Sequence, residues 1–467
     1  MNIHPSIFSR LFQLVRHVRL TPYDVSTPAG RVSERYRKLA WATITSGLSK
    51  GASLLLVFLT VSSGTEQLGA ERFGLWMTIM SIITLLSFAD LGVSNGLISA
   101  VSEASGHDDW PRIRQFVSSG LAMMTAISLV ILGVFFCAYP FIDWGRLINV
   151  VEARSVTEAG PSVAIYVSIF LMSMPLSVVQ KVQVALQDGW VANIWQFVGQ
   201  IGAISGFLLV LKSDGGVPSL VIAVAGIPMI AMTLNFLIYF FLKKKAIKPG
   251  WHLVDLARAR QLGAVGLLFL TLQFMAVIGN ASDNIIIAHI LGADHVSSFS
   301  VTQRLAMTLG IAQLFISPLW PIFGEALSRR EYAWARGILT KALLLSVGLG
   351  LMAACFLLMQ GEQVIVWWAG AEFAPSKRLI AGFAVFSMLL GVGGVLSVFL
   401  NNATYLRSQA GIYVAASLVS MVLKVILITH WQDASGAIWG TVIGYSLIFV
   451  VPALFIAYSD RFLPKSI

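Results

Sequence analysis

The chain has 467 residues, of which 57% are hydrophobic and only 12% charged, and its formal net charge is +10. Soluble domains carry about 25% charged residues, so this composition excludes a soluble globular protein. The basic residues lie in short segments beside apolar runs long enough to cross a bilayer, which excludes a nucleic-acid-binding surface and indicates membrane topology instead.

The N-terminal segment, residues 1–39, is basic and is expected to lie in the cytoplasm. Within it, apolar residues recur at helical spacing over residues 7–18, and Arg10, His17 and Arg19 occupy other positions. This pattern is typical of a basic helix lying on anionic lipid. A disordered basic tail explains the same residues, so both interpretations stay open.

Twelve apolar segments are expected to span the membrane as helices, which predicts an all-α polytopic membrane protein. They are residues 40–62, 73–99, 116–141, 161–187, 190–212, 217–242, 263–290, 296–324, 338–360, 379–403, 409–430 and 435–458. The first six form a predicted bundle over residues 40–242, and the last six a second bundle over residues 263–458. A cytoplasmic linker, residues 243–262, joins them and is expected to place an amphipathic helix at the membrane interface, and a cytoplasmic tail covers residues 459–467.

The basic residues orient these helices. They are frequent before the first helix, in the linker and after the eighth and twelfth helices, all on one side of the membrane. The loops on the opposite side hold few basic residues. By the positive-inside rule both termini are cytoplasmic, and an even number of helices agrees. A bacterial inner membrane is the predicted location.

Three features recur from the first bundle to the second, and they predict a pseudo-symmetric repeat of six helices. They are Leu-Gly-Ala-acid at 68–71 and 291–294, Glu-Ala at 103–104 and 325–326, and Trp110 with Arg112 and Trp334 with Arg336. Transporters built from two repeats of this kind bind the substrate between the two halves, and the halves rock to expose it to each side of the membrane in turn. The alternative is that similar loop positions favour similar residues.

Two cations lie deep within predicted helices. Lys50 lies about 15 Å along the first helix, on a small polar face expected to point into the bundle, and Arg304 lies about 12 Å along the eighth. A charge there costs roughly 2.5–3.5 kcal/mol on insertion scales. Each is therefore expected either to bind substrate or to form a structural ion pair, for example Arg304 with Asp283.

Four further charged residues are candidates. Lys181 and Lys424 are expected either to add to a cationic substrate-binding cavity or to extend toward the membrane interface. Asp90 marks a predicted helix break, and Asp283 lies beside amide residues. Either carboxylate is expected to bind a coupling proton or sodium ion, or to pair with a nearby cation or backbone group.

Amide side chains form stripes along several predicted helices, which indicates helix contacts or a wet cavity. With Lys50 and Arg304, they favour a cavity that attracts anions, phosphates especially. Cys137 and Cys355 lie in apolar runs and indicate neither a disulfide nor a metal site. The sequence holds no nucleotide-binding or metalloprotease motif, so no cofactor, metal or catalytic residue is predicted.

The stretch LGAERFGLWMTIMSIITLLSFADLGVSNGL at 68–97 resembles the polysaccharide transporter family of lipid-linked oligosaccharide flippases, which includes O-antigen and exopolysaccharide flippases. The second half resembles the family at Asp283-Asn284, Leu291-Gly292 and Ser300 to Arg304-Leu305. The resemblance covers most of residues 40–458 and implies the multidrug/oligosaccharidyl-lipid/polysaccharide flippase fold, with two six-helix bundles around a central cavity.

The resemblance also implies a substrate, an undecaprenyl-pyrophosphate-linked repeat unit that crosses the inner membrane during surface polysaccharide, lipopolysaccharide or exopolysaccharide biosynthesis. A polysaccharide polymerase and other assembly proteins are the expected partners. The alternative is a cation-coupled multidrug exporter of the same fold, which the basic character of the deep charges disfavours. A membrane enzyme such as a polymerase is disfavoured because no loop is long enough for a catalytic domain, and a scaffold has no positive support.

Overall fold

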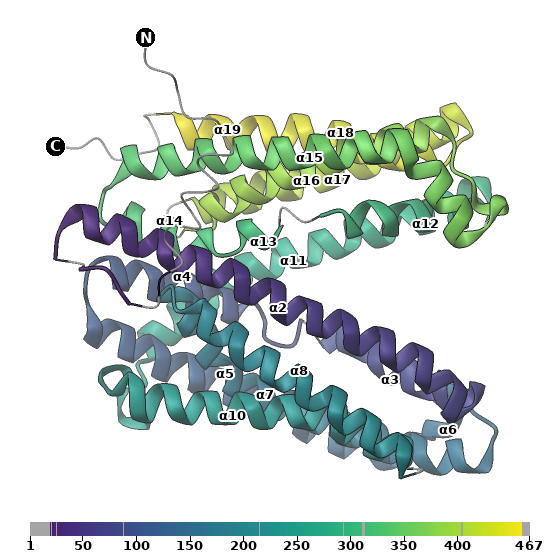
Figure 1. Cartoon of the computed structure of the whole chain (residues 1–467), viewed down its shortest axis with the longest axis horizontal. Helices are drawn as coiled ribbons and strands as arrows, with labels where there is room; N and C mark the ends of the chain where they lie inside the picture. Colours follow the sequence, from purple (N-terminus) through teal and green to yellow (C-terminus); the bar gives the residue numbers. More distant parts are fainter. Residues whose placement is uncertain are drawn as a thin grey trace. The chain divides into compact units, whose positions relative to one another are not determined.

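The computed structural model describes residues 19, 21–24, 26–86, 88–213, 215–292, 294–310, 313–402 and 405–459. Every regular element among these residues is a helix (Figure 1), and ten helical stretches are long and apolar enough to cross a membrane. The predicted amphipathic segment 7–18 and most of the tail 459–467 lie outside the described residues. The prediction of an all-α polytopic membrane protein is confirmed.

The chain divides into two compact units, Met1–Gly266 and Leu267–Ile467. Unit 1 contains α2 (Pro28–Leu68), α3 (Ala70–Leu86), α4 (Val93–Gly106), α5 (Trp110–Ala138), η1 (Tyr139–Phe141), α6 (Trp144–Ile148), α7 (Ala153–Ala185), α8 (Gly189–Lys212), α9 (Val217–Val221), η2 (Ile222–Gly226), α10 (Ile227–Leu237), η3 (Ile238–Lys243), η4 (Lys245–Ile247) and η5 (Trp251–Leu253). The stretch from α9 to η3 is one membrane-spanning helix with two π-helical turns.

Unit 2 contains most of α11 (Leu256–Leu291), whose first turns belong to unit 1. It continues with α12 (Asp294–Thr308), α13 (Gln313–Ile316), α14 (Leu319–Ser328), α15 (Tyr332–Ala369), η6 (Ala371–Phe373), α16 (Lys377–Leu400), α17 (Leu406–Trp431), α18 (Ser435–Gly444), η7 (Tyr445–Val450) and α19 (Val451–Tyr458). The last three form one spanning helix.

Two membrane crossings are broken, one in each unit. In unit 1, α3 and α4 are separated by a turn in which Leu91 and Gly92 have φ of 50° and 73° and the Asp90 carboxylate accepts the Gly92 N–H. This confirms the predicted break at Asp90. In unit 2, the predicted continuous helix 296–324 is wrong, because α12 ends at Thr308 and α14 begins only after Pro318, which cannot donate a helical hydrogen bond. With the ten long stretches, these make twelve crossings among the described residues, six in each unit.

The two broken crossings have the same surroundings. Each follows a glycine of positive φ, Gly69 at 77° and Gly292 at 105°, inside a Leu-Gly-Ala-acid element. Each is followed by a residue in the left-handed region, Asp108 at 56° or Arg330 at 61°, before the next long helix. The repeated sequence features therefore correspond to repeated backbone turns, as pseudo-symmetric bundles require.

The acidic residue of the first of these elements is structural. The Glu71 carboxylate accepts the backbone N–H groups of Glu152 at 2.7 Å and Val151 at 2.8 Å, just before α7 begins. These hydrogen bonds hold the pKa of Glu71 below its ordinary value. The neighbouring Arg72 pairs with Glu158 of α7 at 2.8 Å. The charges at this end of unit 1 therefore fix helix ends to one another.

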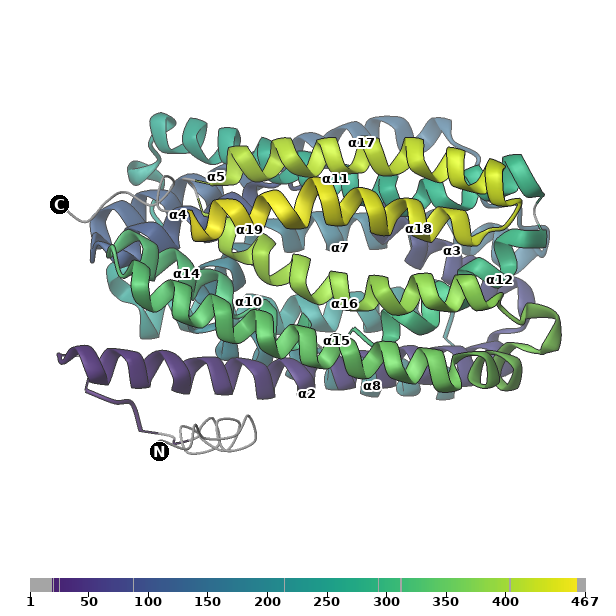
Figure 2. The ribbon, with the colours of Figure 1, turned by 90° about the horizontal axis from the view of Figure 1, so that it is seen from above.

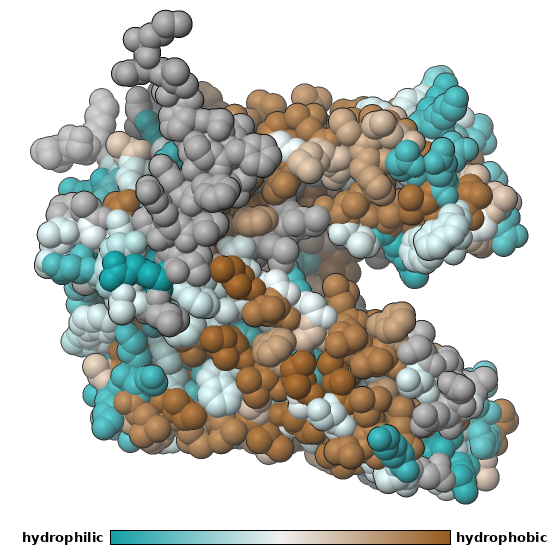
Figure 3. Space-filling model, viewed as in Figure 1, coloured by the Kyte–Doolittle hydropathy of each residue, from teal (hydrophilic) through white to brown (hydrophobic). Residues whose placement is uncertain are grey.

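The first helix is longer than its apolar segment. It begins at Pro28, with the Thr27 hydroxyl accepting the Gly30 N–H, so residues predicted as part of the N-terminal segment extend the helix beyond the hydrocarbon. In both units, hydrophobic residues cover the middle of the helices and hydrophilic residues gather at their ends (Figure 3).

A ladder of glycines holds α18 against α17, which lies alongside it in Figures 1 and 2. Gly436, Gly440 and Gly444 follow one another at four-residue intervals and face α17. A Cβ at Gly440 would lie 2.5 Å from the backbone nitrogen of Lys424. Small residues at this spacing allow helix backbones to approach closely inside a membrane, and here they close α18 over Lys424.

We expect Gly440→Leu to destabilise unit 2. The new side chain must push α18 away from α17, and overpacking of this kind costs about 1–3 kcal/mol or more. Thermal unfolding of the purified protein in detergent measures the effect as a lower Tm. Gly411→Leu is the matched control, because Gly411 lies on the partner helix α17 and a Cβ there would meet nothing within 4 Å. Equal Tm values for the two variants would contradict the ladder.

Candidate functional site

The most deeply buried charges of unit 2 form an ion pair. Lys424 Nζ on α17 lies 2.5 Å from Asp283 Oδ1 on α11, and the two side chains are only 3% and 5% exposed. The ammonium also donates a hydrogen bond to the Gly279 carbonyl at 2.8 Å. Both charges lie within membrane-spanning helices, where each would be costly alone.

This geometry corrects two expectations. Lys424 does not extend to the interface, because α18 covers it: a Cβ at Gly440 would lie only 2.9 Å from the Cγ of its side chain. Asp283 pairs with Lys424 and not with Arg304. The sequence contained a signal for this arrangement, the Gly436, Gly440, Gly444 ladder, which marks the close helix pair that buries Lys424.

Arg304 lies exposed on α12 of unit 2. One turn earlier on the same helix, the Ser300 hydroxyl donates to the Asn284 amide oxygen on α11 at 3.2 Å. This hydrogen bond joins α11 to α12, and the guanidinium of Arg304 takes no part in it. Within the described part of the chain, Arg304 forms no ion pair with a carboxylate.

In unit 1 an amide chain connects three helices. The Ser49 hydroxyl of α2 donates to Gln196 of α8 at 3.4 Å, and the Gln196 amide donates to Gln180 of α7 at 3.3 Å. Asn193, one turn earlier on α8, donates to Thr45 of α2 at 3.2 Å. The predicted amide stripes therefore act as helix contacts on this face of unit 1.

Lys50 borders this chain but is exposed on unit 1, which corrects the expectation that it points into the bundle. The buried stripe of α2 runs through Thr45, Ser49 and Ala52, and Lys50 is displaced from it by one position. Among the residues that the structure describes, no carboxylate pairs with Lys50. Its ammonium is therefore available to a ligand that reaches this face of the helix.

Lys181 lies on α7, next to Gln180, and is half-buried. Its ammonium interacts electrostatically with the Asp90 carboxylate, which sits in the turn between α3 and α4. The structure thus relates two predicted site residues that no sequence pattern associates. Asp90 also fixes its own turn through the Gly92 N–H at 3.0 Å.

One buried polar pair of unit 1 was not predicted. Gln183 and Asn235 exchange two side-chain hydrogen bonds, of 2.7 and 3.0 Å, between α7 and α10. Gln183 was part of a predicted stripe of amides. Asn235 is a single amide in a very apolar segment, and that position is the only sequence signal that it needs a buried partner. Both side chains are almost fully buried and satisfied by each other, which identifies them as structural.

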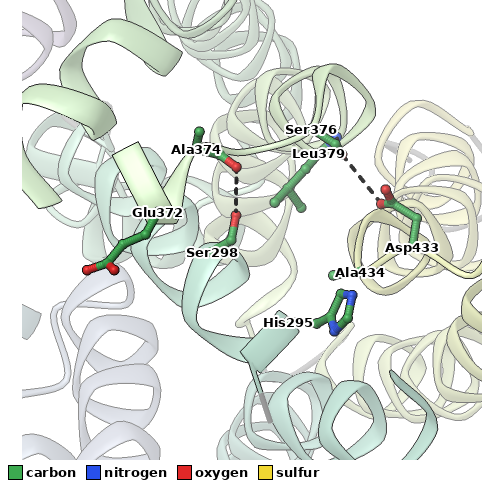
Figure 4. Close-up of a pocket in the computed structure, with 8 residues that line it drawn as sticks. All are labelled: His295, Ser298, Glu372, Ala374, Ser376, Leu379, Asp433 and Ala434. Atoms are coloured by element: carbon green, nitrogen blue, oxygen red, sulfur yellow. Dashed lines mark hydrogen bonds between the residues drawn. The ribbon is translucent and has the colours of Figure 1, made fainter. Parts of the chain in front are cut away.

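A separate cavity of about 340 Å³ lies in unit 2, where α12, α16 and α18 begin (Figure 4). It is lined by His295, Ser298, Glu372, Ala374, Ser376, Leu379, Asp433 and Ala434. Its polar groups are engaged in holding these helix starts: Ser298 bonds to the Ala374 carbonyl, and Asp433 accepts the Ser435 N–H at 2.6 Å. The Glu372 side chain points away from the others in Figure 4. None of the predicted site residues lines this cavity.

Comparison with known sequences identifies one family. A family model described as "Polysaccharide biosynthesis protein" matches residues 39–327. No curated protein matches the chain.

Solved structures share the fold at low sequence identity. A MATE protein in the bent conformation has a TM-score of 0.76 at 16% identity, with 90% of this chain and 93% of that chain covered. A multidrug resistance MATE family transporter of the MOP superfamily, in its outward-facing conformation, has a TM-score of 0.74 at 15% identity, covering 90% and 94%. A MOP superfamily transporter from Pyrococcus furiosus, described as having a binding pocket of reverse polarity, has a TM-score of 0.75 at 15% identity, covering 91% and 95%.

The ion pair of unit 2 allows a direct test of charge compensation. We expect Lys424→Met to destabilise the protein by about 3–5 kcal/mol, because it leaves a buried carboxylate unpaired. The double variant Lys424→Met/Asp283→Leu is expected to recover most of that loss, since it removes both charges. Equilibrium unfolding of the four proteins in detergent gives the coupling energy. Additive single effects, with no recovery in the double variant, would contradict the pairing.

Proposed function

The chain belongs to the polysaccharide biosynthesis protein family, within the superfamily of multidrug, oligosaccharidyl-lipid and polysaccharide flippases, and we propose that it moves a lipid-linked oligosaccharide across the membrane. The family and the fold are those of membrane transporters. The proposed cargo is an undecaprenyl-pyrophosphate-linked repeat unit, and the proposed setting is the bacterial inner membrane with both termini in the cytoplasm. On this proposal the protein carries out no bond chemistry.

The observation that carries the proposal is the contrast between compensated and uncompensated charges. Lys424 forms an ion pair with Asp283, and Lys181 has a longer-range electrostatic interaction with Asp90, each within one unit. Lys50 and Arg304 are exposed within the spanning region, and among the described residues neither has a carboxylate partner. A cation in hydrocarbon is costly, so an anionic ligand that binds either Lys50 or Arg304 would supply the negative charge that the described residues do not.

A pyrophosphate-linked glycolipid has the required chemistry. Its pyrophosphate carries the negative charge that an ammonium and a guanidinium bind best, and its sugars offer hydroxyl groups to amides such as Gln196. Its polyprenyl tail is apolar and stays in the bilayer throughout. Alternating access through two six-helix units then requires only that the headgroup move past the membrane interior.

The remaining candidates take different roles in this proposal. Lys424 is buried beneath α18, so it serves to hold Asp283 and α11 rather than to contact substrate. Lys181 lies half-buried beside the amide chain and remains a candidate substrate contact. Asp90 and Asp283 remain the candidate carboxylates for ion coupling, each next to a lysine.

Drug export is the alternative function, since one structural neighbour is described as a multidrug resistance transporter. An exporter of organic cations needs a carboxylate that its substrates can reach. In unit 2 the Asp283 carboxylate is buried under Lys424, which favours the anionic substrate. Susceptibility of a deletion strain to cationic drugs, compared with its surface polysaccharide, distinguishes the two functions.

We expect Lys50→Gln and Arg304→Gln each to lower the rate of transport by about tenfold to a hundredfold, the size of a lost charge-assisted hydrogen bond. Stability should not fall, because both side chains are exposed and neither loses a carboxylate partner among the described residues. Flipping of a lipid-linked oligosaccharide in proteoliposomes measures the rate. Lys50→Arg should retain most of the activity.

Lys212→Gln is the matched control, because Lys212 is an exposed lysine at the end of α8, outside the polar stripe. Transport at the wild-type rate by both the Lys50→Gln and Arg304→Gln variants would remove these cations from the proposed site. An equal loss in the Lys212→Gln control would show a general charge effect instead.

A further inference from the structure

The segment between η3 and α11, residues 244–255, is fixed to unit 1 by the first turns of α5. Arg114 Nε donates to the Lys248 carbonyl at 2.9 Å, and the Ser118 hydroxyl accepts the Gly250 N–H at 3.2 Å. The Ser119 hydroxyl both accepts the Asp255 N–H and donates to the Asp255 carbonyl. The segment is therefore a rigid part of unit 1, and the separate amphipathic helix expected over this linker is replaced by short turns and the start of α11.

The attachment buries one apolar side chain and turns the others outward. Ile247 is fully buried, whereas Trp251 is 71% exposed and Leu256 is 75% exposed. A rigid segment gains nothing within its own unit by exposing a tryptophan and a leucine. These two side chains therefore need a partner outside unit 1.

Exposed lysines accompany these apolar side chains. Lys243, Lys245 and Lys248 are all exposed, and Lys248 Nζ lies 4.2 Å from the centre of the Phe241 ring. The one carboxylate of the segment, Asp255, is used to start α11, since it accepts the Ala257 N–H at 2.7 Å. The outward face of residues 243–256, here called the basic platform, thus combines positive charge with apolar side chains.

The position of the platform indicates its partner. One spanning helix ends at Lys243 and the next begins at Leu256, so the platform lies where the chain leaves and re-enters the hydrocarbon. Tryptophan favours this depth, and lysines there attract anionic headgroups. We propose that the basic platform is a binding site for anionic phospholipid, with the lysines on the phosphate groups and Trp251 and Leu256 inserted among the acyl chains.

The test is a lipid titration of the full-length protein followed by native mass spectrometry, with phosphatidylglycerol and phosphatidylcholine as probes. The variant Lys243→Gln/Lys245→Gln/Lys248→Gln is expected to bind phosphatidylglycerol about a hundredfold more weakly, with phosphatidylcholine binding unchanged. Trp251→Ser should weaken both lipids by a smaller factor. The matched control is Arg146→Gln/Arg154→Gln/Lys212→Gln, which removes three exposed cations from the opposite ends of the unit 1 helices.

Loss of phosphatidylglycerol binding in the platform variant but not in the control supports the proposal. Unchanged binding in the platform variant overturns it, and so does an equal loss in the control, which would reflect net charge alone. Unchanged lipid binding together with loss of a co-purifying acidic protein would assign the platform to a protein partner and also overturn the lipid site. A wild-type Tm for each variant shows that the fold is intact.

Discussion

The ion pair between Lys424 and Asp283 is the constraint on which the rest of unit 2 depends. Either charge alone would be strongly destabilising at that depth, so α11 and α17 must lie close enough for the two side chains to pair. The pair forms only because Gly440 lets α18 close over α17 and exclude lipid from the lysine. A second interaction of the ammonium, its hydrogen bond to the Gly279 carbonyl, also joins it to α11. The glycines of α18 thus allow the close helix packing that buries the ion pair between Lys424 and Asp283 of α11.

Unit 1 joins its spanning helices α2, α7 and α8 with amides, and its close ion pairs, such as Arg72 with Glu158, lie near helix ends. Its chain from Ser49 through Gln196 to Gln180 satisfies polar groups without any net charge. Lys181 of α7 interacts electrostatically with the Asp90 carboxylate, which lies in the turn that interrupts a membrane crossing. The two units therefore repeat the same order of turns and helices but compensate buried polarity differently. A shared backbone with divergent interior chemistry is expected where one fold is adapted to several kinds of cargo.

The sequence was sufficient for the class of fold, the helix order and the break at Asp90, because long apolar runs and an Asp-Leu-Gly turn act locally. It was insufficient for the break before Pro318, since membrane helices tolerate single glycines and prolines and local sequence does not say which are tolerated. It also failed for Lys424. Whether a lysine two turns from a helix end extends outward or inward depends on a partner helix, here on Gly440, and on a carboxylate distant in sequence. For Lys50 the predicted face was wrong by one position, which on a helix is enough to turn a side chain outward.

That outward turn is what makes Lys50 informative. A protein that neutralises Lys424 with a buried aspartate, and that joins Ser300 to Asn284 beside Arg304, has the means to neutralise other cations as well. Lys50 and Arg304 are left exposed in the spanning region of their units, without a carboxylate among the residues that the structure describes. Stability alone gives no reason to keep them, because a neutral side chain would remove the cost of placing a cation in hydrocarbon. We propose that a ligand supplies the missing negative charge for part of the transport cycle, and a phosphate-bearing headgroup, as in a lipid-linked sugar, has the chemistry to do so.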